Sequence, residues 1–119
     1  MEDCLFCRIV AGKIPSTKVF EDDAVLAIRD INPQAPVHVL LLSKRHHASV
    51  VDASRADPAV FGRIVAAAVK VATADGVAER GFRLLTNTGP DAGQAVPHLH
   101  FHLLGGLGDG VAAVVARGR

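Results

Sequence analysis

The chain has 119 residues and a mass of 12.5 kDa, and its composition is 50% hydrophobic and 21% charged. This composition provides a core for one domain and excludes a disordered chain. A net charge of +1 and only 4% aromatic residues argue against nucleic-acid binding. No apolar run approaches the ~20 residues of a membrane-spanning helix. Because the acidic start Met1–Asp3 lacks signal-peptide features, we expect one cytoplasmic domain over residues 1–119.

The first part of the chain predicts a short helix followed by three strands. The helix covers residues 4–11 and is closed by Gly12 and Pro15. Two short strands, over 18–21 and 24–30, flank the polar turn Asp22–Asp23. A proline-containing loop over 32–36 then precedes a longer strand over 37–43. The last strand is apolar nearly throughout, which suits a central strand buried on both faces.

A long helix is the clearest element of the second part. Asp57 is predicted as its N-cap with Pro58 at the first helical position, and Gly76 as its C-terminal stop. Apolar residues recur between them with a period near 3.6: Val60, Phe61, Ile64, Val65, Ala68, Val71 and Ala72. A strand over 82–86, a polar loop and a strand over 98–104, ended by Gly105–Gly106, complete the chain. This order indicates an α+β protein with a mainly antiparallel sheet.

The segment His98–Leu104 alternates histidine with apolar residues. On a strand this places the three histidines on one face and Leu99, Phe101 and Leu103 on the other. The apolar face would contact the core, and a slip of one residue would bury the imidazoles instead. We therefore expect a firmly fixed register.

Such a row of histidines has three interpretations. A single metal site using all three is disfavoured, because His98 and His102 are roughly 13 Å apart along a strand. Nucleophilic or acid–base catalysis suits an imidazole that is neutral near pH 7. A solvated face with chance histidines is the third interpretation, which strict alternation after a glycine-containing loop argues against.

The loop Asn87–Val96 directly precedes the histidine segment. Its glycines allow backbone N–H groups to turn inward as an anion-binding nest, and Asn87 adds an amide donor at its entrance. Glycine-containing loops are often only turns. Beside the histidines, however, this loop indicates chemistry on a phosphate.

The segment His98–Leu104 matches the pattern His–apolar–His–apolar–His–apolar–apolar, and on this motif the sequence resembles the histidine triad (HIT) family. The branch it resembles is that of nucleotide-binding phosphoramidate hydrolases. The resemblance extends over nearly the whole chain and includes Phe6–Ile9, Ile14–Pro15, Phe20–Asp23, Asp30–His38, Lys44–His46 and Gly93–Gln94.

The resemblance implies a five-stranded antiparallel sheet with one long and one short helix, in a protein that is usually a homodimer. It also implies that His100 is the nucleophile, attacking the α-phosphorus of a nucleoside 5′-phosphoramidate or related nucleotide. Water would then release a nucleoside monophosphate from the nucleotidyl-histidine, and a backbone carbonyl accepting from Nδ1 would leave Nε2 for the attack. Two alternatives stay open: hydrolysis of dinucleoside polyphosphates, and a regulatory module that binds nucleotide or zinc with little catalysis.

The resemblance assigns further residues to a nucleotide. Phosphate oxygens would be held by Asn87, His102 and the backbone N–H groups of Gly93, Gln94, Ala95 and Val96. Asp30 would accept from the ribose hydroxyls, although it could be a surface-turn aspartate. The purine slot would be lined by residues that could equally be ordinary core: Phe6, Ile9, Ile28 and Ile31. His38 would support the histidines from the neighbouring strand.

Two departures from the family pattern affect substrate choice. Many relatives carry Ser or Thr where this chain has Ala95, so a hydroxyl near the leaving group is missing. The tail Leu107–Arg119 lacks a Trp that some relatives have. The preferred leaving group and base therefore do not transfer from the resemblance.

The pair Cys4 and Cys7 has three interpretations. A redox pair should follow a strand, but only three residues precede Cys4. A structural zinc site is the second, since some relatives supply its other two ligands from the positions of His46 and His98. Two unligated thiols are the third, and His47 is an alternative to His46. No carboxylate cluster indicates a need for Mg²⁺.

Overall fold

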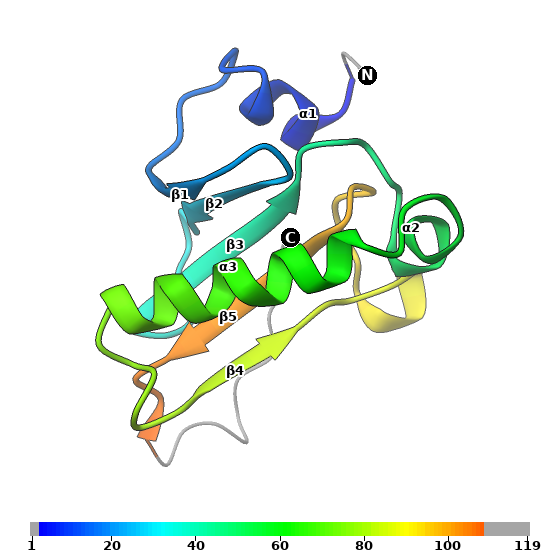
Figure 1. Cartoon of the computed structure of the whole chain (residues 1–119). Helices are drawn as coiled ribbons and strands as arrows, with labels where there is room; N and C mark the ends of the chain where they lie inside the picture. Colours follow the sequence, from blue (N-terminus) through cyan, green and yellow to red (C-terminus); the bar gives the residue numbers. More distant parts are fainter. Residues whose placement is uncertain (1–2, 109–119) are drawn as a thin grey trace.

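The computed structural model describes residues 3–108, and Figure 1 shows the whole chain. Its elements in chain order are α1 (Leu5–Val10), β1 (Lys18–Glu21), β2 (Val25–Arg29), β3 (Val37–Ser43), α2 (Val50–Ala56), α3 (Val60–Ala74), β4 (Phe82–Leu85), the 3₁₀ turn η1 (Pro90–Ala92) and β5 (His100–Gly105). The strands form one sheet in the order β1-β2-β3-β5-β4, with every neighbouring pair antiparallel. The predicted α+β class and five-stranded antiparallel sheet are confirmed.

Strand β3 lies in the centre of the sheet because it is apolar on both faces. It pairs with β2 on one side and β5 on the other. Val39 and Leu41 belong to the core that packs beneath α3, whereas Leu40 and Leu42 belong to a second core on the side of α1. The prediction of a central strand buried on both faces is confirmed.

Helix α3 covers one face of the sheet, crossing β3 and β5 in Figure 1. Ile64, Ala68 and Val71 are buried on its inner side, as the 3.6-residue period predicts. The chain turns out of this helix at Gly76, whose φ of +76° favours glycine. The predicted stop is therefore confirmed, directly after the C-cap Asp75.

The start of the long helix was predicted wrongly, because a separate helix precedes it. Asp57 is the C-cap of α2 and not the N-cap of α3, which begins at Val60. Helix α2 begins at Val50 and is capped by Ser49, whose hydroxyl accepts from the backbone N–H of Val51 at 3.2 Å. Because only Ala53 of this helix is buried, its sequence has no apolar periodicity from which the helix could be predicted. Residues 3–108 thus contain three α-helices, where one long and one short helix were expected.

Both faces of β5 are buried, which corrects the expectation for the histidine row. Leu99 and Leu103 pack into the α3 core as predicted. On the opposite face His100 and His102 are also buried, as is His98 just before the strand, with exposed fractions of 2%, 0% and 0%. His98 and His100 are covered by the Phe6 ring of α1, and His102 packs against His38 of β3, contacts that sequence periodicity does not show.

The ends of β5 also differ from the prediction. The strand begins at His100 and continues through Gly105, where a Cβ atom would lie 2.9 Å from the Val77 side chain. The preceding Leu99 is instead held by its N–H, which donates to the His47 carbonyl at 2.7 Å. Within residues 3–108 no helix is long and apolar enough to cross a bilayer. Of the predicted substrate-selecting tail, residues 109–119 lie outside the described range.

Candidate active site and metal centre

The tautomer of His100 is fixed by the backbone. Its Nδ1 lies 2.7 Å from the carbonyl oxygen of His98, and a carbonyl can only accept. The proton is therefore on Nδ1 and the lone pair on Nε2, as expected from the sequence for a nucleophilic imidazole. The Phe6 ring packs edge-to-face on this imidazole, with centroids 4.9 Å apart. His100 is thus held both by a hydrogen bond to the backbone and by packing against the Phe6 ring.

The tautomer of His102 is fixed by a neighbouring histidine. The backbone N–H of Gln34 donates to Nδ1 of His38 at 3.0 Å, so the proton of His38 is on Nε2. That Nε2 lies 3.0 Å from Nδ1 of His102 and donates to it, which places the His102 proton on Nε2. The row therefore presents a lone pair on His100 and an N–H donor on His102.

Burial keeps His38 in the neutral form that this chain of hydrogen bonds requires. It lowers the pKa of His38 below its ordinary value of 6.5, while the nearby Asp30 carboxylate opposes the shift. The Oδ2 atom of Asp30 lies 3.5 Å from Nε2 of His38. The predicted supporting role of His38 thus has a defined geometry.

Asp30 is a buried carboxylate with one oxygen that lacks a donor in the described part of the chain. Its side chain accepts from the backbone N–H of Asn32 through Oδ1 at 2.8 Å. Oδ2 has no hydrogen-bond partner among the described residues, and the residue is only 7% exposed. A buried carboxylate oxygen needs donors, and the hydroxyls of a ligand would supply them. The alternative of a surface-turn aspartate does not fit this burial.

Three of the four predicted purine-slot residues are brought together. Phe6, Ile9 and Ile28 belong to the apolar cluster between α1 and the sheet. Ile31 lies outside this cluster, in the turn after β2, and is 73% exposed. The structure therefore does not bring Ile31 together with the other three, although its exposed side chain is accessible to a ligand.

The predicted phosphate loop is held in shape by Gln94. Its side-chain amide donates to the carbonyls of Ala48 and Val96, and its Oε1 accepts from the N–H of Gly89 at 2.9 Å. The backbone N–H groups of Gly93 and Gln94 are also used inside the turn, donating to Pro90 and Gly89. These two N–H groups therefore stabilise the turn, which corrects the expectation that all four from Gly93 to Val96 face a phosphate.

Three further residues lie in or near the loop, two predicted from the sequence and one not. Asn87 is half-buried at the entrance of the loop, and the Ala95 methyl is exposed. Thr86, which the sequence did not single out, donates its hydroxyl to the carbonyl of His100 at 2.7 Å. Its position directly after β4 was the available signal, because that strand pairs with β5.

The predicted metal ligands converge on one point. Sγ of Cys4 and of Cys7 and Nδ1 of His46 and of His98 all lie within 4.8 Å of one another. Nδ1 of His98 lies 3.3 Å from Cys4 Sγ, 3.5 Å from Cys7 Sγ and 3.3 Å from Nδ1 of His46, and Cys7 Sγ lies 3.3 Å from Nδ1 of His46. Ligands about 2.0–2.3 Å from a tetrahedral zinc ion are separated by roughly 3.3–3.8 Å, so this donor set fits such an ion.

The histidine ligands are oriented for metal binding. Nε2 of His98 donates to the carbonyl of Ser43 at 2.7 Å, so its Nδ1 lone pair faces the thiols. Burial lowers the pKa of His98 to about 4, which keeps the ring neutral. His47 points elsewhere, with Nε2 3.8 Å from Asp57 Oδ2. The cluster therefore contains His46 and not His47.

The thiols favour a cation for electrostatic reasons. Burial, together with the neighbouring Cys4, raises the pKa of Cys7 to about 11. Two adjacent thiolates are costly without a positive charge between them, and a divalent cation offsets that cost. The cluster thus has the ligands, spacing and charge requirement of a Cys₂His₂ metal site.

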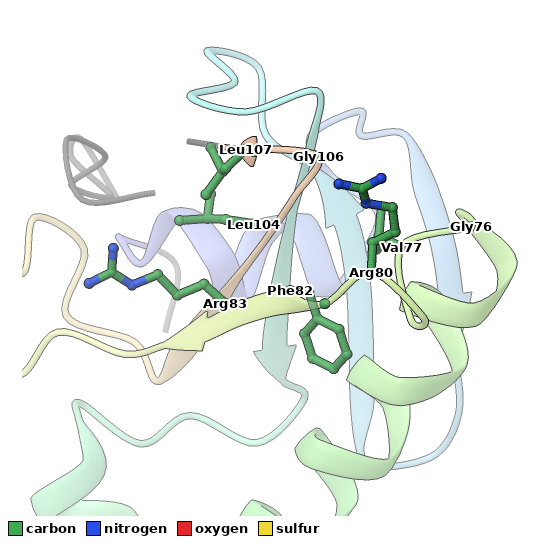
Figure 2. Close-up of a pocket in the computed structure, with 10 residues that line it drawn as sticks. Gly76, Val77, Arg80, Phe82, Arg83, Leu104, Gly106 and Leu107 are labelled. Carbon is green, nitrogen blue, oxygen red and sulfur yellow. The ribbon is translucent and has the colours of Figure 1, made fainter. Parts of the chain in front are cut away.

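A separate cavity of about 650 Å³ lies near the other end of β5. Arg80, Arg83 and Leu104 are among its lining residues, and Figure 2 shows the two arginines on different sides of it. None of the predicted site residues lines this cavity. The histidine row and the metal ligands therefore form a distinct region.

Comparison with known proteins matches this histidine region to a family. The model of the HIT domain matches residues 11–108. The chain belongs to the HIT family. Its relatives include the purine nucleoside phosphoramidase of Escherichia coli, 44% identical over 105 residues that cover 88% of each chain. Another is the adenylylsulfatase HINT1 of Arabidopsis thaliana, 47% identical, with 86% of this chain and 70% of that protein covered.

A solved HIT structure agrees in three dimensions. A HIT family hydrolase from Clostridium thermocellum has a TM-score of 0.87 and 51% identity, with 89% of this chain and 92% of that chain covered. The predicted family, the HIT fold and the expectation of a HIT-family hydrolase are thereby confirmed.

Proposed function

We propose that this HIT protein hydrolyses nucleoside 5′-phosphoramidates or related nucleotides through a covalent intermediate on His100. The observation that supports this most is the pair of fixed tautomers, which sets a lone pair on His100 Nε2 beside an N–H on His102. Displacement at phosphorus requires a nucleophile and a hydrogen-bond donor that stabilises the phosphate oxygens. The names of the relatives, a purine nucleoside phosphoramidase and an adenylylsulfatase, fit this reaction class.

The reaction proceeds in two displacements. The Nε2 lone pair of His100 attacks the α-phosphorus, a P–N bond to histidine forms, and the bond to the leaving group breaks. The leaving amine takes up a proton from solvent, whereas a sulfate or phosphate leaving group departs as an anion. Water then attacks phosphorus, transfers a proton to solvent, and the P–N bond to His100 breaks to release a nucleoside monophosphate.

The other site residues hold the nucleotide during both steps. His102 Nε2–H donates to a non-bridging phosphate oxygen, aided by Asn87 and the N–H groups of Ala95 and Val96. Asp30 accepts from the ribose hydroxyls, since its Oδ2 lacks a donor in the described chain. The base lies against the apolar side chains of Phe6, Ile9 and Ile28. The exposed Ile31 lies at the rim.

Trapping the intermediate tests this proposal. The protein is mixed with an adenosine 5′-phosphoramidate, quenched during turnover and digested, and the adenylyl group is located by mass spectrometry. We expect it on His100. An adduct on another residue, or release of nucleoside monophosphate without any adduct, would contradict the mechanism. Parallel assays with adenylyl sulfate and a dinucleoside polyphosphate identify the leaving group, and nucleotide binding without any turnover would support the regulatory alternative.

We propose that the Cys₂His₂ cluster holds a structural Zn²⁺ ion. Cys4, Cys7, His46 and His98 supply four donors at tetrahedral spacing, which is typical of closed structural sites. When bound, the ion supplies charge neutralisation for the thiols. Metal analysis should give one equivalent of zinc per chain, lost in Cys4→Ser. Freshly purified protein without zinc would contradict the proposal.

We further propose that the protein is a homodimer, as the resemblance implies. Val65 and Val69 lie one turn apart on α3 and are 46% and 48% exposed, which gives this helix an apolar strip on its outer side. Sedimentation analysis should give twice the chain mass, and Val69→Glu should shift it towards the monomer.

A further inference from the structure

The metal cluster and the candidate nucleophile share one residue. The ring of His98 faces the thiols through Nδ1, 3.3 Å from Cys4 Sγ. Its backbone carbonyl accepts the hydrogen bond that fixes the tautomer of His100, at 2.7 Å. A movement of His98 on filling or emptying the cluster would therefore displace the carbonyl that holds His100.

Phe6 forms a second connection between the two sites. It lies between the two cysteines on α1 and is fully buried. Its ring packs edge-to-face on His98, with centroids 5.9 Å apart, and on His100, with centroids 4.9 Å apart. The same side chain belongs to the apolar cluster of Ile9 and Ile28 proposed to hold the base. The position of α1 thus decides the shape of the nucleotide site.

Helix α1 depends on the cluster for its position. It has only six residues, far below the length at which an isolated helix is stable. Its N-terminus is capped by a cluster ligand, because the N–H of Cys7 donates to Cys4 Sγ at 3.3 Å. Ligation by Cys4 and Cys7 would tie both ends of its first turn to His46 and His98, which come from elsewhere in the chain.

We propose that metal bound by Cys4, Cys7, His46 and His98 positions Phe6 and His100, so that metal and nucleotide bind cooperatively. This inference rests on the proposed nucleotide site at His100. Cooperativity of this kind is reciprocal: the factor by which metal tightens nucleotide binding equals the factor by which nucleotide tightens metal binding. The cluster is then part of the machinery that orients the nucleophile, in addition to stabilising the fold.

Two binding measurements on the full chain test the cooperativity. Calorimetry measures the affinity for AMP in Zn²⁺-loaded protein and in protein stripped with a chelator. We expect AMP to bind about tenfold more weakly to the stripped protein, within the usual range for coupled sites. Competition with a chromophoric chelator then measures Zn²⁺ affinity, which AMP should raise by the same factor. Equal AMP affinity in both forms would overturn the inference.

Matched variants locate the coupling. His46→Ala removes a ligand whose ring contacts are with the cluster, and AMP should bind it as weakly as stripped protein, with or without Zn²⁺. Phe6→Leu keeps all four ligands, so Zn²⁺ should bind while the coupling factor falls towards one. Phe61→Leu makes the same change on the α3 face and should leave the coupling intact. Equal coupling in Phe6→Leu and Phe61→Leu would show that Phe6 does not connect the metal cluster to the nucleotide site.

Two further outcomes separate this inference from the alternatives. Loaded protein that binds AMP cooperatively with Zn²⁺ but never turns over a phosphoramidate would contradict the proposed function alone. Normal turnover with metal-independent AMP affinity would contradict the cooperativity alone. If circular dichroism shows that stripped protein and His46→Ala both unfold, the cluster acts on the whole fold, and the local positioning of Phe6 and His100 is wrong.

Discussion

The two faces of the sheet use burial differently. Beneath α3 the core is entirely apolar, with Leu41 and Leu103 at its centre. On the opposite face a smaller apolar cluster accompanies buried histidines, cysteines and an aspartate, whose polar atoms are largely fixed by specific hydrogen bonds. The first face stabilises the fold, while the second uses the exclusion of water to fix tautomers and to shift pKa values, lowering those of His38 and His98 and raising that of Cys7. Substitutions on the two faces should therefore change different properties of the protein.

The largest effect is expected at His100. His100→Ala removes the proposed nucleophile, so the rate of nucleoside monophosphate release should fall at least about 10³-fold. The fold should remain, because the α3 core is untouched. Steady-state kinetics with an adenosine phosphoramidate, alongside thermal unfolding, measure both quantities. A variant with near-normal turnover would end the assignment.

A matched change on the other face of β5 should lower stability and leave the catalytic rate unchanged. Leu103 is fully buried, and Leu103→Ala should lower the free energy of unfolding by about 2–5 kcal/mol. The folded fraction should retain its catalytic rate, since the side chain points away from the histidines. Urea denaturation and active-site titration check this. Loss of rate without loss of stability would show that the faces are not independent.

A smaller effect on catalysis is expected at His38. His38→Phe removes the donor that fixes the His102 tautomer, so kcat should fall about 10- to 100-fold, as is typical for residues that orient a reacting histidine. Nitrogen NMR should show that the His102 proton no longer stays on Nε2. A lower kcat with an unchanged His102 tautomer would argue for a merely structural role.

The smallest effect is expected at the rim of the α3 face. Arg29 donates to Asp75 in a two-point ion pair that joins β2 to the end of α3. The hydrogen bonds from Arg29 lower the pKa of Asp75 below its ordinary 3.8. This stabilisation is therefore present above about pH 4 and is lost as the pH falls through the lowered value.

Because Arg29 is partly exposed, Asp75→Asn should lower the free energy of unfolding by less than about 1 kcal/mol at neutral pH. Below the lowered pKa the variant and the parent should become equally stable, which urea denaturation at several pH values measures. A difference that grows at acidic pH would contradict the stated cause.

The sequence predicted the parts of this protein that depend on local pattern. Strand β3 and the inner side of α3 follow from apolar runs and periodicity. Helix α2 was missed because only Ala53 is buried, and the start of α3 was misplaced because Asp57 followed by Pro58 has the composition of a helix start. Local composition alone does not distinguish the end of one helix from the beginning of the next.

By itself, the sequence determined the fold class, the family and which residue types share a face of β5, because these depend on spacing along the chain. Only the tertiary structure decided that the histidines are buried, that His46 and not His47 joins the cysteines, and which nitrogen of His38 and of His102 holds the proton. These properties depend on contacts between residues far apart in sequence. A hydrogen-bond partner such as the Gln34 N–H or the Ser43 carbonyl leaves no trace in the side-chain pattern, since every residue has a backbone.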